Sequence, residues 1–200
     1  PTKAEIKSFL QSGFQVSKFK QAYGFKTLRT QDPAEVMRRI WAAPTFEVHG
    51  LVGGYHGPGV KTVVPGHGEL KVSMRLVPNQ TPEKAFALLK KHVAKLNPEV
   101  TVEREGMLHP FRGVFDGPYV DAVKRAVKAG FGKEPAFIRE GGSIGAVVTM
   151  QKAWKVPILF MGLSLPEHGY HAPNEYFDWG QASGGMKAFV HYFAELAAKR

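Results

Sequence analysis

The sequence is organised around two motifs, Arg139-Glu140-Gly141-Gly142-Ser143-Ile144 and Glu167-His168-Gly169-Tyr170-His171-Ala172-Pro173-Asn174-Glu175. The first combines a charged pair with two glycines and a hydroxyl, which is poor material for a core or a helix but suits a loop whose backbone cradles a ligand. An apolar, strand-like run from Val156 to Met161 lies between the two motifs. Because sites are commonly built at the ends of buried elements, both motifs are candidates for functional residues.

The composition describes an ordinary globular chain. With 200 residues, of which 44% are hydrophobic, the chain can bury one good core or two small ones, so one or two domains are expected. It contains no cysteine, so any bound metal must be held by His, Asp and Glu, and a reducing, cytoplasmic location is predicted. No apolar run approaches the roughly 20 residues of a membrane span and no signal peptide opens the chain, so no membrane partner is expected.

The charge of the chain raises the question of nucleic-acid binding. The formal net charge is +10 and the pI is near 9.8, values seen in proteins that bind nucleic acids. The lysines and arginines are spread along the predicted helices, however, with no long basic run and no nucleic-acid motif. We therefore predict no nucleic-acid partner. A basic nucleic-acid binder remains a third interpretation, which would show steeply salt-dependent binding.

The first half of the chain mixes helical and strand-like patterns. Asp32-Pro33-Ala34-Glu35 is a strong helix start, with a capping carboxylate, a proline at the first helical position and a glutamate three residues after the cap. The clearest strand is Glu69–Val77, where apolar and polar residues alternate. We predict four helices in this half, over residues 2–11, over residues 16–22, beginning at residue 33, and over residues 81–96. We predict three strands, near residues 46–51, over residues 69–77 and near residues 100–102.

The pattern breaks up between Gly106 and Gly117, and we place a domain boundary there. Beyond it we predict a helix over residues 118–131, a buried strand over 156–161 and a long helix over 178–196. The Gly184-Gly185 pair within the last helix costs about 1 kcal/mol per glycine relative to alanine, which indicates a close packing contact.

At these motifs the sequence resembles a known family, the zinc-dependent exopeptidases and amidohydrolases that include carnosinase-type dipeptidases, glutamate carboxypeptidase and aminoacylase. The two motifs above match, and so do Gly59-Val60-Lys61-Thr62-Val63-Val64-Pro65 and Met74-Arg75-Leu76-Val77-Pro78-Asn79-Gln80-Thr81-Pro82. The resemblance implies an α/β fold: a small α+β lid or dimerisation domain with an open four-stranded sheet over residues 1–117, then the C-terminal segment of the catalytic domain over residues 118–200.

The resemblance also implies site residues and cofactors. His171 corresponds to a metal ligand, whereas His168 is interpreted as lining or structural. Arg75 corresponds to the arginine that binds the terminal carboxylate of the substrate, and Thr62 to a residue that reaches the substrate from the partner subunit. The substrate-binding loop corresponds to Glu140, Gly141, Gly142 and Ser143. Two zinc ions per site are expected, with manganese or cobalt as alternatives, in a homodimer that acts on a dipeptide or small peptide.

Several parts of such an enzyme have no counterpart in this sequence. It contains no Glu-Glu dipeptide and no His-x-Asp motif, which in the family supply metal ligands and the general base from the N-terminal half. We therefore expect the chain alone to be inactive and the parent enzyme, or a separate N-terminal half, to complete the site. Gly145 replaces a usual proline, which predicts a looser substrate loop. The alternative from another class is a non-catalytic dimerisation or interaction module.

Overall fold

The computed structural model describes residues 1–140 and 144–198. The chain forms two compact units: unit 1 consists of residues 1–42 and 111–200, and unit 2 of residues 43–110. Unit 1 contains α1 (Lys3–Leu10), α2 (Val16–Ala22), α3 (Pro33–Ala42), α5 (Pro118–Phe131), α6 (Gly145–Trp154), the 3-10 turn η1 (Pro166–His168) and α7 (Trp179–Ala197). Unit 2 contains β1 (Thr45–Gly53), β2 (Gly68–Arg75) and α4 (Pro82–Leu96). The predicted domain division at residue 117 concerns the parent enzyme and stays a prediction.

The N-terminal helices of unit 1 form where their caps predict. Thr2 accepts a hydrogen bond from the Glu5 N–H at 3.2 Å, and the Glu5 carboxylate accepts one from the Thr2 N–H at 2.7 Å, which completes a capping box for α1. Asp32 accepts a hydrogen bond from the Ala34 N–H at the start of α3. The buried cluster between these helices consists of Phe9, Met37 and Ala42, with Ile6, Phe14 and Trp41 packed against it.

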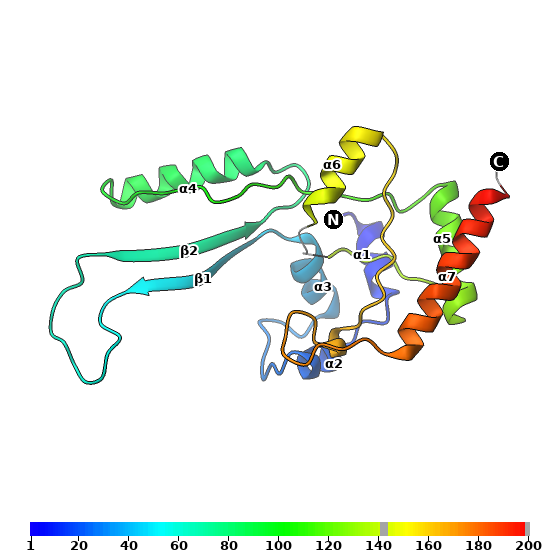
Figure 1. The fold of residues 1–200 in the computed structure, drawn as a ribbon, viewed down its shortest axis with the longest axis horizontal. Helices are drawn as coiled ribbons and strands as arrows, with labels where there is room; N and C mark the ends of the chain where they lie inside the picture. The colour runs from blue at the N-terminus through cyan, green and yellow to red at the C-terminus, as the bar shows by residue number, and fades with distance from the viewer. Residues whose placement is uncertain (141–143, 199–200) are drawn as a thin grey trace. The chain divides into compact units, whose positions relative to one another are not determined.

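Helices α5 and α7 pack side by side (Figure 1) along a seam of small residues. A Cβ atom added at Gly130 would meet the backbone of Gly184 and Ala188, and one added at Gly184 would meet the ring of Phe131. The close packing predicted from the Gly184-Gly185 pair is therefore confirmed. Arg125 of α5 joins Glu195 of α7 through two hydrogen bonds of 2.7 and 2.6 Å at the rim of the same contact.

Unit 2 is built on a long antiparallel hairpin. Thr45 pairs with Arg75 at one end of the ladder and Gly53 with Gly68 at the other, and the register shifts at His49, which has no partner opposite it. This extra residue is a β-bulge, and it keeps Leu51 on the same face as Phe46 and Val48 although the three residues do not alternate strictly. The strand pattern predicted around residues 46–51 is thereby confirmed and explained.

Helix α4 follows β2 after a short turn and runs along the length of the hairpin in Figure 1. Thr81 caps it by accepting a hydrogen bond from the Lys84 N–H at 3.3 Å, and Pro82 occupies its first position. Ala85, Leu89 and Val93 are partly buried, as predicted for its inner face. Leu96, which was predicted to belong to the same face, is 73% exposed because the helix ends there.

The predicted four-stranded sheet is not confirmed, since the described residues form one sheet of two strands. The segments predicted as strands near residues 100–102 and over 156–161 adopt no regular structure. A strand requires a neighbour for its ladder hydrogen bonds, and in the described part of the chain neither segment pairs with one. Helix α6 was not predicted. It begins at Gly145, where the sequence pattern indicated only a loosened loop.

Candidate functional site

The loop that carries His171 lies between η1 and α7. His171 is exposed and has a φ of 66°, and Asn174 has a φ of 62°. Left-handed backbone of this kind is uncommon for residues other than glycine and is concentrated at functional sites. The N–H of His171 donates to the carboxylate of Glu175 at 3.2 Å, and the imidazole lies edge-on to the ring of Tyr170. A hollow beside the loop is lined by Ser164, Glu175, Tyr176 and Phe177.

A pair of tyrosine hydroxyls, one of them from the neighbour of His171 in the sequence, was not predicted. The hydroxyls of Tyr23, after α2, and Tyr170 are 3.2 Å apart. The hydrogen bond with Tyr23, then burial, then the negative charge of Glu140 raise the pKa of Tyr170 well above its usual value. Glu140, which was predicted to belong to the substrate loop, thus lies within electrostatic reach of Tyr170. Only the position of Tyr170 beside His171 could have suggested it.

Arg139, the residue before the predicted substrate loop, is held in place by an ion pair. Arg139 forms an ion pair with Glu5 of α1, whose side chain is only 12% exposed, and Arg112 reaches the same carboxylate at 3.1 Å. Arg139 also lies over the ring of Phe9. The N–H of Thr2, followed by the charges of Arg139 and Arg112, holds the pKa of Glu5 below its usual value despite burial. Glu140 is exposed, whereas Gly141, Gly142 and Ser143 lie outside the described residues.

The described residues of this chain do not form a complete metal site by themselves. A zinc site in a protein needs about three side-chain ligands. Within residues 1–140 and 144–198, no three His, Cys, Asp or Glu side chains are grouped in a way that could hold a metal ion. His171 fits the role of one ligand, because its imidazole is exposed at the end of a constrained loop. Other ligands would have to come from outside the described residues.

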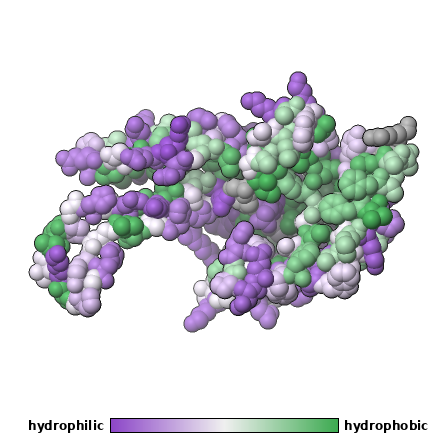
Figure 2. Space-filling view, viewed as in Figure 1, coloured by the Kyte–Doolittle hydropathy of each residue, from purple (hydrophilic) through white to green (hydrophobic). Residues whose placement is uncertain are grey.

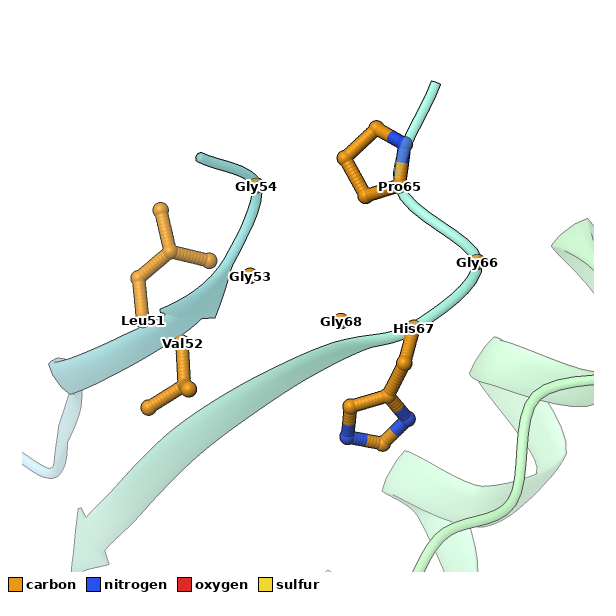
Figure 3. A pocket seen from close by; sticks show the side chains of 8 residues that line it. All are labelled: Leu51, Val52, Gly53, Gly54, Pro65, Gly66, His67 and Gly68. Atoms are coloured by element: carbon orange, nitrogen blue, oxygen red, sulfur yellow. The ribbon is translucent and has the colours of Figure 1, made fainter. Parts of the chain in front are cut away.

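The predicted substrate residues of unit 2 lie at opposite ends of its hairpin. Arg75 ends β2, is exposed and stands opposite Thr45, while Thr62 lies in the exposed loop between the strands. The base of this loop encloses a hollow, drawn in Figure 3, with Gly53 and Gly68 facing each other and the His67 ring at one side. Its lining residues are Leu51, Val52, Gly53, Gly54, Pro65, Gly66, His67 and Gly68, which include no permanently charged side chain.

Comparison with known proteins shows which family this chain resembles. The sequence model of the peptidase dimerisation domain matches residues 6–101. The Cys-Gly metallodipeptidase dug1 of Schizosaccharomyces pombe is 31% identical over 191 residues, which cover 92% of this chain and 40% of the relative. The crystal structure of the M20 family metallo-carboxypeptidase Sso-CP2 from Sulfolobus solfataricus aligns with a TM-score of 0.83 at 28% identity, over 96% of this chain and 44% of that one. Residues 6–101 thus match a peptidase dimerisation domain, and the chain as a whole is similar to metallopeptidases of the M20 family.

These similarities confirm the resemblance drawn from the sequence motifs. Human carnosine dipeptidase 1 has the same fold, with a TM-score of 0.86 at 26% identity over 99% of this chain and 43% of that structure. The chain spans about 40% of the length of the curated relatives that it matches. Among its described residues, no helix is both long and apolar enough to cross a membrane.

Proposed function

We propose that this chain is part of a metal-dependent dipeptidase and contributes one metal ligand and several substrate-binding residues to its active site. The observation that carries the proposal is the His171 loop: an exposed histidine in a left-handed backbone conformation, within a motif of the M20 family. Similarity to the Cys-Gly metallodipeptidase of fission yeast and to human carnosine dipeptidase 1 supports a dipeptide or small peptide as substrate.

In this proposal His171 holds one metal ion, and the remaining ligands and the general base come from the rest of the parent enzyme. The metal is zinc, two ions per site, with manganese or cobalt as alternatives. When bound, it supplies Lewis-acid activation of water and of the amide carbonyl. The 200-residue chain alone is inactive, since no group of three potential ligands occurs among its described residues.

Three elements of the chain orient the substrate. Arg75 binds the terminal carboxylate, because a planar guanidinium can donate two parallel hydrogen bonds to it. The loop of Glu140, Gly141, Gly142 and Ser143 binds the substrate backbone, and Thr62 reaches the site of the partner subunit. The match to a peptidase dimerisation domain supports a homodimer formed through residues 1–117, with residues 118–200 as the catalytic segment. The cysteine-free composition supports a cytoplasmic location.

The test compares the parent enzyme, purified from its natural host, with the isolated chain. Intact mass, metal content and hydrolysis of Cys-Gly and carnosine are measured on both. We expect a longer or two-part enzyme with about two metal ions that loses hydrolysis and metal when His171→Ala is introduced. The matched control is His191→Ala, an exposed histidine on α7, which should leave both unchanged. Full activity of the His171→Ala enzyme would refute the proposal.

A second candidate function is a non-catalytic dimerisation module. The match of residues 6–101 to a dimerisation domain favours it. Such a module would form a dimer in solution, bind no metal and show no change in any property on substitution of His171. Metal content and dipeptide hydrolysis of the parent enzyme, measured with and without His171→Ala, separate this module from an active-site component.

A further inference from the structure

We propose that His168 and Asp178 close the base of the loop that carries His171, and that this pair positions His171 to bind its metal. The inference rests on the proposed function for the role of His171, but the closure of the loop can be tested without it. Both residues are positioning residues, because neither is directed at the substrate or the metal.

The imidazole of His168 is held at both nitrogens. His168 is 2% exposed, its Nε2 lies 2.7 Å from Oδ2 of Asp178, and its Nδ1 accepts a hydrogen bond from the Leu165 N–H at 3.1 Å. A backbone N–H can only donate, so Nδ1 must be unprotonated and the neutral ring carries its hydrogen on Nε2. Nε2–H therefore donates to Asp178. With both nitrogens engaged, His168 is excluded as a second metal ligand beside His171.

Asp178 connects this imidazole to the start of α7. Its Oδ1 accepts the Gln181 N–H at 2.9 Å and caps the helix, while its Oδ2 accepts from His168. The hydrogen bond from the Gln181 N–H, helped by the one from His168, lowers the pKa of Asp178 below its usual value. One carboxylate thus joins the last residue of η1 to the first turn of α7, ten residues further along the chain.

The same histidine closes the loop through its backbone and its ring faces. The His168 carbonyl accepts the Tyr176 N–H at 3.1 Å, so the chain returns to His168 after seven intervening residues (169–175). The rings of Tyr176 and Phe177 pack on the imidazole, with centroids 5.0 and 5.7 Å away. Within this closed loop the left-handed conformation of His171 is unfavourable by itself, and surrounding contacts must hold it.

Three substitutions separate the bond between His168 and Asp178 from the capping of α7. Asp178→Asn has nearly the same side-chain volume and keeps an oxygen that can cap α7. Its amide N–H groups then face the Nε2–H of His168, so two donors oppose each other and the hydrogen bond is lost. His168→Gln keeps an N–H donor that can reach Asp178, whereas His168→Asn keeps only the acceptor for Leu165. The control is Thr81→Ala, which removes the cap of α4 in unit 2. All four variants are compared at a temperature where circular dichroism shows each of them folded.

The first measurement is amide hydrogen exchange in the 200-residue chain. We expect exchange at Ala172, Glu175 and Tyr176, whose N–H groups bond within the loop, to accelerate about tenfold in Asp178→Asn and His168→Asn. His168→Gln should restore most of the protection, and Thr81→Ala should leave it unchanged. Native exchange rates in Asp178→Asn and His168→Asn would overturn the proposal.

The second measurement is the affinity of the parent enzyme for Co²⁺, with His171→Ala as reference. We expect Asp178→Asn to weaken Co²⁺ binding by about tenfold, as is typical when the support of a ligand is lost. If His171→Ala weakens Co²⁺ binding but Asp178→Asn leaves the Co²⁺ affinity unchanged, the positioning role of the pair is overturned. If His171→Ala itself has no effect, the proposed function fails, and hydrogen exchange alone decides whether the pair closes the loop.

Discussion

Thr45 and Arg75 stand directly opposite each other in the β1–β2 ladder, and the hydroxyl of Thr45 is buried with no hydrogen-bond partner in the described part of the chain. Opposite residues of an antiparallel pair extend their side chains from the same face of the sheet. The proposed carboxylate-binding arginine thus has an unsatisfied hydroxyl beside it. A buried polar group without a partner costs about 1–3 kcal/mol.

This relationship predicts that Thr45→Val does not destabilise the chain. The substitution keeps the shape of the side chain and removes the orphan hydroxyl, so the free energy of unfolding should stay the same or rise by up to about 1 kcal/mol. The control is Thr81→Val, which removes a hydroxyl that does cap a helix and should cost about 1 kcal/mol. Urea denaturation measures both, and a comparable loss in Thr45→Val would contradict the prediction.

Arg75→Lys should weaken binding of dipeptides in the parent enzyme. Lysine keeps the positive charge but cannot donate two parallel hydrogen bonds to a carboxylate. We expect KM to rise by about tenfold to a hundredfold, which corresponds to about 1.5–3 kcal/mol for charged hydrogen bonds.

The control substrate for Arg75→Lys is a dipeptide amide, which lacks the terminal carboxylate and should be hydrolysed equally by both enzymes. Arg104→Lys, on an exposed segment of unit 2, is the control variant. An equal rise of KM for the dipeptide and its amide would contradict the role of Arg75.

Glu5→Gln should destabilise unit 1. The carboxylate of Glu5 forms ion pairs with Arg139 and Arg112, and its side chain is only 12% exposed. A neutral glutamine at this position leaves both guanidinium groups without a carboxylate partner. We expect a loss of about 2 kcal/mol in the free energy of unfolding. Glu35→Gln, which removes two ion pairs with exposed arginines within α3, should have a smaller effect. Thermal unfolding of both variants decides between them.

The Glu5 carboxylate also predicts a dependence of stability on pH. Its pKa is lowered on folding from 4.5, so the unfolded chain takes up a proton more readily than the folded chain. The contribution is therefore fully present above pH 4.5 and is lost as the pH falls through the lower folded value. Glu5→Gln should flatten this part of the stability profile between pH 5 and pH 2 (roughly the range over which lowered carboxylates titrate). An unchanged slope would show that Glu5 is not responsible.

Gly130→Ala should destabilise the contact between α5 and α7. Alanine favours an isolated helix over glycine by about 1 kcal/mol, but here its Cβ would meet the backbone of Gly184 and Ala188. Overpacking of this kind costs about 1–3 kcal/mol, so the variant should unfold at lower urea concentration. Gly162→Ala, where a Cβ would meet nothing within 4 Å, is the control. A stabilised Gly130→Ala chain would contradict the packing.

Local signals predicted the helices of this chain well. The bounds of α2 and α5 were predicted as the structure has them, and α4 and α7 differ by a residue or two from the predicted ranges. Each of these helices has a local start or stop signal, such as Thr81-Pro82 or Asp178, that depends on no distant residue. Helix α6 was missed because it starts at Gly145 without a side-chain cap.

Strands and the site depended on distant contacts and were predicted less well. Val156–Met161 has the composition of a buried strand, but burial and a ladder need partners that the sequence pattern does not specify. The motifs identified His171 and Arg75 as candidates, while the hydroxyl pair of Tyr23 and Tyr170 and the ion pair of Glu5 with Arg139 could not be foreseen. These pairs join residues that are 147 and 134 positions apart, and no local pattern encodes such contacts.

The discontinuity of unit 1 sets an order of events on the ribosome. Unit 2 is one continuous stretch, so it can complete its hairpin and helix as soon as residue 110 has emerged. Glu5 must wait for Arg139, which is synthesised 134 residues later, on the order of ten seconds at ordinary elongation rates. A nascent chain that stalls near residue 110 therefore displays a finished unit 2 and an unfinished unit 1, which makes it a substrate for chaperones and proteases.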